Sequence, residues 1–314
     1  MKLVFIADPL DSFKIYKDST YAMMVEAAKR GHELHFALQE GLIWKGGRVL
    51  ADCSRLTLTG AKDFWYRTEA PKQAPLAEFG AVLMRKDPPF DAEYLVGTWL
   101  LELAQNQGAR VFNHPRALRD HSEKLAIAEF AQFAAPSLVT RVETELQEFI
   151  DANGDVILKP LDAMGGRSVF RVTDRDPNRN VIIETLTGYG ARSIMAQRYI
   201  PEIRDGDKRI LLIAGKPVPH CLARIPKPGE TRGNLAAGGT GVARPLSPRD
   251  LEIAEALGPR LAARGLLLVG LDVIGDWLTE INVTSPTCFR EITDQTGFNV
   301  AGMFLDALEA ACKA

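Results

Sequence analysis

Two apolar segments near the carboxyl end of the chain carry three side chains that suit a hard metal ion. Asp272 lies in the first segment, and Glu280 and Asn282 lie in the second, among valine, leucine and isoleucine residues. Glu280 and Asn282 are two positions apart, so on a β-strand both side chains project from the same face. Carboxylate and amide oxygens that converge on one point are ligands suited to Mg²⁺. The alternative is an ordinary strand with one solvated face.

The register of these two segments decides whether the three side chains can meet. A tight two-residue turn at Gly275-Asp276 would pair Asp272 with Thr279 and place Glu280 on the opposite face. A shared metal site requires a register that differs by one residue. We therefore predict an odd-length loop centred on Asp276, which pairs Asp272 directly with Glu280, with a β-bulge as the other solution.

The composition is that of a folded globular protein with no strong charge bias. The 314 residues suffice for two or three domains, 46% are hydrophobic and 25% are charged. A net charge of −2 predicts no nucleic-acid or membrane partner. The four cysteines form no CxxC pair, so a thiol-reducing compartment fits best. No segment reaches 18 unbroken apolar residues, and we expect a cytoplasmic protein.

Residues 1 to about 120 alternate between strand and helix patterns. The pattern predicts strands at Lys2–Ala7, His32–Gln39, Val82–Arg85 and Arg110–Asn113, with helices over 18–30 and 92–107. Asp18 can cap the first helix and Gly31 can end it. This alternation is typical of a parallel sheet in an α/β layer. No GxGxxG follows the first strand, so no dinucleotide site is expected.

From about His121 onward the strand patterns dominate. We predict helices over 123–133 (capped by Ser122) and 144–152, strands over 156–159, 169–172, 194–200, 209–213 and 218–224, and helices over 248–264 and 300–311. No internal repeat is present. The chain divides into three predicted units, which span residues 1–120, 121–200 and 201–314.

A loop that contains glycines, Asp162–Ser168, follows the strand ending at Lys159-Pro160. Gly165 and Gly166 let backbone N–H groups approach a phosphate, although an ordinary hairpin turn explains them equally well. The Walker A pattern GxxxxGK[ST] is absent. Lys159 occupies a position that should be half-buried, and a buried lysine needs a partner such as phosphate oxygens.

Arg209 and Arg224 lie on the two strands of a second predicted hairpin. With Gly215-Lys216 as its loop, Asp207 faces Arg224, and Arg209 shares their face. Two arginines without matching carboxylates could bind an anionic substrate. The two prolines of the second strand predict an edge strand or a bulge. A solvated charged turn is the alternative for residues 205–209.

Residues 226–241 contain five glycines and two prolines, with Arg232 and Asn234 near the centre. A loop this long in a compact domain is usually a lid, a binding loop or a disordered segment. Arg85-Lys86-Asp87 lies at the carboxyl end of a predicted central strand, where ligands bind in open α/β sheets. No histidine has a catalytic partner at a recognisable spacing, and no GxSxG or Cys–His pattern is present.

Together these motifs resemble the bacterial glutathione synthetase family of ATP-grasp ligases. The similarity covers about residues 1–312, with the following blocks in order: MRKDPPFD (84–91), SEK (122–124), ILKPLDAMGG (157–166), DGDKRIL (205–211), CLARIP (221–226), GETRGNLAAGG (229–239) and GLDVIGDWLTEINVTSPT (270–287). The resemblance implies an α/β protein with an ATP-grasp fold preceded by a Rossmann-like pre-ATP-grasp domain. Residues 121–200 would form the central lid subdomain, and 201–314 the catalytic subdomain with a substrate loop at 226–241.

The resemblance also implies a role for each matching residue. ATP would contact Lys124, Lys159, Gly165, Gly166, Ser168, Gln197, Tyr199, Ile200 and Asp207, with Asp207 on the ribose. Mg²⁺, with Mn²⁺ as the alternative ion, would be held by Asp272, Glu280 and Asn282. The dipeptide and glycine would meet Arg85, Arg209, Arg224, Arg232, Asn234 and Ser285, and Arg209, Arg224 and Arg232 would be catalytic. Ala163 replaces a glycine of the family loop and is expected to stiffen it without abolishing binding.

The implied reaction joins glycine to γ-glutamylcysteine at the expense of ATP, through an acyl phosphate, in a homotetrameric enzyme. Two other interpretations stay open. An ATP-grasp ligase for other amino acids would keep the same nucleotide and metal residues. A non-catalytic ATP-binding regulator would be expected to lack one of the lysines or metal ligands, and this sequence retains them all.

Overall fold

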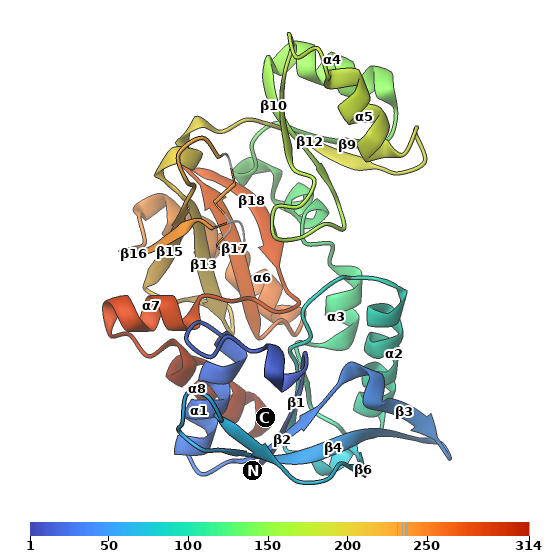
Figure 1. Ribbon diagram of the computed structural model, residues 1–314, viewed down its shortest axis with the longest axis vertical. Helices are drawn as coiled ribbons and strands as arrows, with labels where there is room; N and C mark the ends of the chain where they lie inside the picture. Colours follow the sequence, from blue (N-terminus) through green and yellow to red (C-terminus); the bar gives the residue numbers. More distant parts are fainter. Residues whose placement is uncertain (231, 234, 236–237, 314) are drawn as a thin grey trace.

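The computed structural model describes residues 1–230, 232–233, 235 and 238–313. This part of the chain forms three β-sheets with helices packed against them (Figure 1). Short 3-10 helices connect several of the elements: η1 (Leu10–Ser12), η2 (Gln39–Gly41), η3 (Leu76–Glu78), η4 (Leu125–Phe133) and η5 (Pro201–Asp205). Within the described residues, no helix is both long and apolar enough to cross a membrane.

The first sheet has the strand order β3-β4-β2-β1-β7-β8, with β5 and β6 paired to β4. Its strands are β1 (Lys2–Ile6), β2 (Glu33–Ala37), β3 (Leu42–Lys45), β4 (Arg48–Leu58), β5 (Tyr66–Thr68), β6 (Lys72–Pro75), β7 (Ala81–Met84) and β8 (Val111–Phe112). The neighbours β2, β1, β7 and β8 run parallel, as the alternation predicted. The antiparallel extension from β3 to β6 was not predicted.

Helices cover both faces of this sheet. They are α1 (Ser19–Lys29) and α2 (Ala92–Asn106), with α3 (Pro115–Asp120) packed against α2, and with α7 (Phe289–Thr296) and α8 (Val300–Lys313) packed against α1. Alternate residues of β1 point to opposite cores: Val4 and Ile6 pack on the side of α2, and Leu3 and Phe5 pack on the side of α1 and α8. Figure 1 shows α8 lying beside α1 in this first layer. Asp18 caps α1 as predicted, with its carboxylate 2.7 Å from the Tyr21 nitrogen.

The second sheet is antiparallel, in the order β11-β10-β12-β9. Its elements are β9 (Ser137–Thr140), β10 (Asp155–Pro160), β11 (Phe170–Thr173), β12 (Ile194–Arg198), α4 (Glu143–Asn153) and α5 (Arg179–Thr187). A separate small core joins the helices to the strands. The prediction missed β9 and α5. The predicted helix over 123–133 is a 3-10 helix that begins only at Leu125, and Phe130 interrupts it with a non-helical backbone.

The third sheet has the order β16-β15-β13-β17-β18, with β14 paired to β13. Its elements are β13 (Asp207–Ile213), β14 (Lys216–Pro217), β15 (His220–Ile225), β16 (Thr240–Pro245), β17 (Leu268–Ile274), β18 (Trp277–Asn282) and helix α6 (Pro248–Ala263). The expectation of an edge strand at 218–224 was wrong, because β16 pairs with the outer side of β15. The irregular passage around the two prolines is present, since β14 and β15 are separate strands.

The β13 hairpin reaches the predicted register by a different turn. Ile213 pairs with Lys216, so the turn is Ala214-Gly215, one position earlier than predicted. Both turn residues have positive φ angles, 48° and 77°, which suits a two-residue hairpin turn. The interruption between β14 and β15 then shifts the register, and Asp207 faces Arg224 as predicted.

The β17–β18 hairpin also differs from its preferred prediction. Ile274 pairs with Trp277, so the turn contains two residues rather than an odd number. The register then shifts by one at Thr279, and Asp272 pairs with Glu280. The odd-length loop was therefore wrong, and the bulge that was the other solution is present. The Thr279 hydroxyl donates to the Asp272 carbonyl at 3.1 Å and stabilises this irregular point.

Candidate active site

A cavity lies where the second and third sheets meet, and the loop 162–168 borders it. The structure brings most of the predicted ATP residues into its lining: Lys124, Lys159, Gly165, Gly166, Gln197, Tyr199, Ile200 and Asp207. Ser168 is not in the lining and has a positive φ angle of 54°. Apolar walls from Ile157, Val169, Ile203 and Ile274, which the sequence analysis did not single out, complete the cavity.

Lys159 is buried in this cavity with uncharged hydrogen-bond partners. Its Nζ atom lies 3.2 Å from the Gln197 Oε1 atom and 3.4 Å from the Thr279 carbonyl oxygen. Burial lowers the pKa of Lys159, and the carboxylate of Glu280 opposes that shift. An ammonium group that lacks a direct carboxylate contact gains from an anionic ligand, so this position suits a phosphate group.

Replacing Lys159 with methionine is expected to weaken ATP binding by about 10- to 100-fold, the value of a charge-assisted hydrogen bond. The wild-type protein should lose ATP affinity as the pH rises through the lowered pKa of Lys159, because only the protonated amine binds phosphate. The methionine variant should lack this pH dependence. Calorimetric titration with a non-hydrolysable ATP analogue checks both results, and Lys216→Met, at an exposed position of β14, serves as the control.

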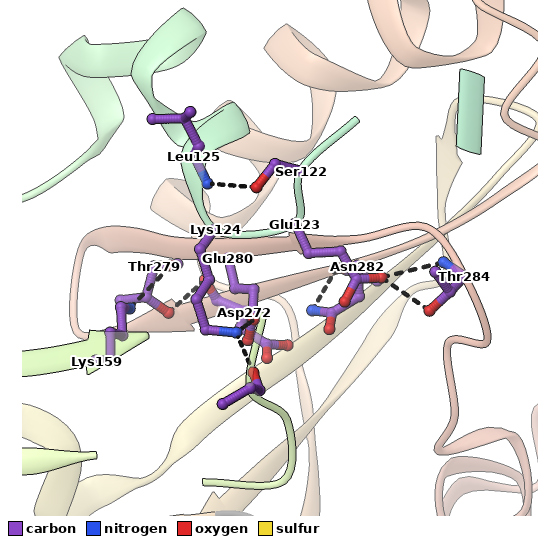
Figure 2. Close-up of polar contacts among 12 residues, drawn as sticks. Ser122, Glu123, Lys124, Leu125, Lys159, Asp272, Thr279, Glu280, Asn282 and Thr284 are labelled. Carbon is purple, nitrogen blue, oxygen red and sulfur yellow. Dashed lines mark hydrogen bonds and ion pairs between the residues drawn. The ribbon is translucent and has the colours of Figure 1, made fainter. Parts of the chain in front are cut away.

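Lys124 connects the acidic strand to the loop 162–168. Its Nζ atom lies 2.8 Å from Glu280 Oε1 and 2.6 Å from the Ala163 carbonyl oxygen, and the side chain is buried. Figure 2 shows Lys124 reaching toward Glu280 from the segment before η4. Both predicted phosphate-binding lysines therefore lie within one cavity, one on each side of β18 residues 279–280.

Glu123 is a positioning residue that the sequence analysis missed, although it lies in the quoted SEK block. Its Oε1 atom accepts hydrogen bonds from the Val283 nitrogen at 2.9 Å. It also accepts from the Thr284 nitrogen at 3.1 Å and the Thr284 hydroxyl at 2.9 Å (Figure 2). Its carbonyl oxygen accepts from the Ile281 nitrogen at 2.8 Å. Glu123 thereby fixes the end of β18 next to Lys124.

Two arginines and two aspartates form a buried cluster on β13, β15 and β17. Arg209 Nε and Nη2 lie 2.6 and 3.1 Å from the two Asp272 carboxylate oxygens. Arg224 Nη2 lies 2.5 Å from Asp207 Oδ2 and 2.9 Å from Asp272 Oδ2. The expectation of arginines without matching carboxylates was therefore wrong. Asp272 comes from β17, the other neighbour of β13, which the hairpin argument did not include.

The pKa values of the two carboxylates in this cluster are shifted in opposite directions. Burial raises the pKa of Asp207 to about 6, against the effect of Arg224. Burial also acts on Asp272, but Arg209 and Arg224 hold its pKa well below the usual range. Asp272 therefore stays ionised, as a metal ligand must. The Asp207 Oδ1 atom is buried without a hydrogen-bond partner in the described residues, so it can accept a bond from a ligand hydroxyl.

The three predicted metal-binding side chains lie together on the paired strands β17 and β18. Asp272 faces Glu280, and Asn282 faces Gly270, with its Nδ2 atom 3.1 Å from the Gly270 carbonyl oxygen (Figure 2). That bond leaves Asn282 Oδ1 to serve as a ligand. The arginines use three of the four lone pairs of Asp272, and one remains. Two carboxylates and an amide suit Mg²⁺ or Mn²⁺. Within the described residues, no group of three or more His, Cys, Asp or Glu side chains could hold a metal, so a site here would depend on Asn282 as the third ligand.

A second cavity adjoins the first and shares Asp272 and Glu280 with it. Four of the predicted substrate residues line this second cavity: Arg209, Arg224, Arg232 and Ser285. Arg232 Nη1 also lies 3.3 Å from the Gly166 carbonyl oxygen, so the loops 226–241 and 162–168 are in contact. Asn234 lies outside the described residues.

Arg85 does not line either cavity. Its guanidinium is buried, with Nε 3.1 Å from the Thr20 hydroxyl and Nη2 2.9 Å from the Pro286 carbonyl oxygen. The residue directly follows β7 in the interior of the first layer, where its backbone nitrogen bonds to the Ile6 carbonyl oxygen. In this structure Arg85 supports the wall of the second cavity, and Asp87, two residues later, lines it.

Comparison with known proteins accounts for this arrangement. The model of the prokaryotic glutathione synthetase N-terminal domain matches residues 1–119, and the model of the prokaryotic glutathione synthetase ATP-grasp domain matches residues 123–297. The chain belongs to the prokaryotic glutathione synthetase family. It is 64% identical to the glutathione synthetase of Ralstonia nicotianae over 99% of this chain and 96% of that protein. The Nitrosomonas europaea glutathione synthetase is also 64% identical, over 98% of each chain.

Solved structures show the same fold in more distant ligases. The D-cycloserine synthetase DcsG is similar with a TM-score of 0.68 at 16% identity, over 99% of this chain and 100% of that chain. The ATP-grasp ligase PsnB, complexed with minimal precursor, Mg and ADP, has a TM-score of 0.63 at 18% identity, over 100% and 98% of the two chains. The predicted α/β class and ATP-grasp fold are therefore confirmed, and this family member is an ATP-dependent ligase.

Proposed function

We propose that this chain joins glycine to γ-glutamylcysteine and forms glutathione, ADP and phosphate. The observation that carries the proposal is the junction of two cavities at Asp272 and Glu280, one lined by lysines and the other by arginines. A nucleotide in the first cavity would present its terminal phosphate toward an acid bound in the second. The 64% identity to two glutathione synthetases, over nearly the full length of each chain, supports the choice of substrates.

The reaction we propose has two bond-forming steps. The cysteinyl carboxylate of the dipeptide attacks the γ-phosphorus of ATP, and ADP leaves with the electrons of the broken bond. The glycine amine then attacks the acyl carbon, and phosphate leaves as the amide forms and the amine releases its protons. Lys124 and Lys159 would neutralise phosphate oxygens in the first step, and Arg209 would stabilise the oxyanion in the second.

Asp272, Glu280 and Asn282 would hold Mg²⁺, with Mn²⁺ as the alternative ion. Such an ion, when bound, neutralises charge on the phosphate oxygens. Lys124 contacts Glu280 directly at 2.8 Å, so the lysine and the metal ligands act on one group of phosphates. Arg224 would keep Asp272 ionised and aligned for this purpose.

The two loops that meet at Arg232 would protect the acyl phosphate from water. Arg232 pairs with Glu230 at 2.6 Å and donates to the Gly166 carbonyl oxygen, so one side chain links the two loops. A reactive acyl phosphate must be shielded until the amine arrives. We propose the units 1–120, 121–200 and 201–314 as the N-terminal, lid and catalytic parts of the enzyme.

An ATP-grasp ligase for other amino acids is the alternative, because its nucleotide and metal residues would be the same. The test is ADP release with γ-glutamylcysteine, with and without glycine, against a panel of other acids and amines. We expect one ADP to be released for each glutathione formed. The full rate of ADP release should require both the dipeptide and glycine. Faster turnover of a different acid or amine would reject the assignment.

The assembly and the compartment are further proposals. We propose a homo-oligomer, a tetramer on the family resemblance, and four side chains favour an interface on one side of the first layer: Trp44, Val96, Trp99 and Leu103 are exposed on β3 and α2. Light scattering against the 34.5 kDa chain mass measures the assembly. The four cysteines are free thiols, which agrees with the proposal of a cytoplasmic location.

A further inference from the structure

The second cavity contains one carboxylate whose role the reaction does not explain. Its acidic lining residues are Asp87, Asp272 and Glu280. Two arginines bind Asp272, and Lys124 binds Glu280. Asp87 is exposed on the cavity wall, and within the described residues it forms no ion pair with a lysine, arginine or histidine. A cationic ligand would therefore find one available carboxylate here.

The backbone holds Asp87 in a fixed place. The Asp87 nitrogen donates to Asp8 Oδ2 at 2.8 Å, and the Asp87 carbonyl oxygen accepts from Lys86 Nζ at 3.0 Å. Lys86 and Asp8 are themselves paired at 2.6 Å. Pro88 follows and restricts the backbone of Asp87 to extended conformations. Such a carboxylate is positioned before the ligand arrives, which reduces the entropy lost on binding.

The surroundings of Asp87 also favour a cation. Asp87 is exposed toward the cavity, but the protein groups around its carboxylate displace water and raise its pKa, while a hydrogen bond with the Ser285 side chain and the charge of Arg85 oppose this effect. Arg85 is directed away, toward Thr20 and the Pro286 carbonyl oxygen, and leaves the cavity side of Asp87 open. An ammonium group placed there would restore the interaction that the carboxylate loses when protein replaces water.

We propose that Asp87 binds the α-ammonium group of the γ-glutamyl residue and selects the dipeptide by that group. This inference rests on the proposed function. The substrates carry two amines, and the glycine amine must lose a proton before it attacks. An ion pair with a carboxylate would stabilise its unreactive charged form. The α-ammonium of the dipeptide stays charged throughout, and Asp87 lines the cavity from the first layer, whereas the residues that would hold the metal line it from β17 and β18.

The test compares γ-glutamylcysteine with glutarylcysteine, which has the same chain without the α-ammonium group. The wild-type protein should prefer γ-glutamylcysteine in kcat/KM by about 10- to 100-fold, the value of a charge-assisted contact. In Asp87→Asn this preference should fall to a few-fold at most, through a higher KM for γ-glutamylcysteine and an unchanged KM for glycine. Asp63→Asn, which removes an exposed carboxylate outside both cavity linings, should retain the preference.

Three results would overturn the inference. The first is equal use of both dipeptides by the wild-type protein, which needs no variant and so does not depend on the folding of Asp87→Asn. The second is an equal loss on both dipeptides in that variant, and the third is a change confined to the KM for glycine. ADP release with a retained preference would reject the role of Asp87 alone, whereas no ADP release with γ-glutamylcysteine would reject the proposed function as well.

Discussion

Replacing Arg209 with alanine is expected to lower kcat by about 10²- to 10³-fold, the usual effect of removing a donor to a developing oxyanion. Arg209 lines the second cavity and is held by both oxygens of Asp272, so its guanidinium is fixed beside the proposed reaction centre. The rate of the second step, in which glycine attacks the acyl phosphate, should decrease most. Steady-state ADP release with γ-glutamylcysteine and glycine measures the loss, and near-normal turnover would reject the role.

The structure makes one control necessary, because Arg209 also neutralises a buried carboxylate. In Arg209→Ala, Asp272 keeps only Arg224 as a cationic partner, and a lower melting temperature is expected. Arg209→Lys retains the positive charge but cannot contact both carboxylate oxygens of Asp272 at once. Its melting temperature should therefore be closer to the wild-type value than its kcat. Arg244→Ala, at an exposed arginine of β16, should alter neither quantity.

Replacing Glu280 with glutamine should lower activity by at least about 100-fold at a fixed Mg²⁺ concentration, since even residues that only support a metal ligand cost 10- to 100-fold. The Mg²⁺ concentration for half-maximal activity should rise, because a neutral amide is a poorer ligand than a carboxylate for this hard ion. Activity measured over a range of Mg²⁺ concentrations tests this result. A metal activation curve that coincides with the wild-type curve would remove Glu280 from the metal site.

Lys124→Met separates the two roles of Glu280. This variant breaks the same 2.8 Å ion pair but keeps the carboxylate. Its KM for ATP should rise, while the Mg²⁺ concentration for half-maximal activity should stay the same or fall, because Glu280 no longer shares its charge with a lysine. If both variants shift the metal curve in the same direction, the ion pair and not metal binding would explain the Glu280→Gln result.

Local patterns predicted the elements of the site better than their long-range partners. The helix cap at Asp18 and the facing pair Asp207 and Arg224 follow from residues close in sequence, and the structure contains both. The pairing of Arg209 with Asp272 could not be predicted in the same way. It depends on β13 and β17 becoming neighbours across 63 positions, and strand order is not encoded in the spacing of either strand.

The β17–β18 hairpin shows how two local preferences compete. A two-residue turn is the more favourable connection, while the shared metal site requires a register that such a turn cannot provide. Because side chains alternate between the two faces of a strand, the three proposed metal-binding residues can share a face only with an odd-length loop or a bulge. The sequence alone did not decide between these two solutions. In the structure the hairpin has the preferred two-residue turn. Thr279 is the extra residue that shifts the register by one, and its hydroxyl donates to the Asp272 carbonyl oxygen.

Arg85 shows a different limit of sequence reasoning. Its place at the end of a central strand was predicted, because β7 ends at Met84. The direction of its side chain depends on residues 285–287, which lie about 200 positions later in the sequence. The Arg85 guanidinium donates a hydrogen bond to the Pro286 carbonyl oxygen. Asp87, in the same MRKDPPFD block, follows the same strand and does line the second cavity, as its place at the carboxyl end of the strand predicted.

The position of α8 beside α1 affects how the newly made protein can fold. Arg30, at the end of α1, binds Asp306, Glu309 and the Gly302 carbonyl oxygen, all from α8. While the ribosome is still adding residues, the first sheet is complete but one of its faces lacks this cover. Leu3 and Phe5 are covered only once α8 has been made, so this layer cannot finish folding before that helix leaves the ribosome.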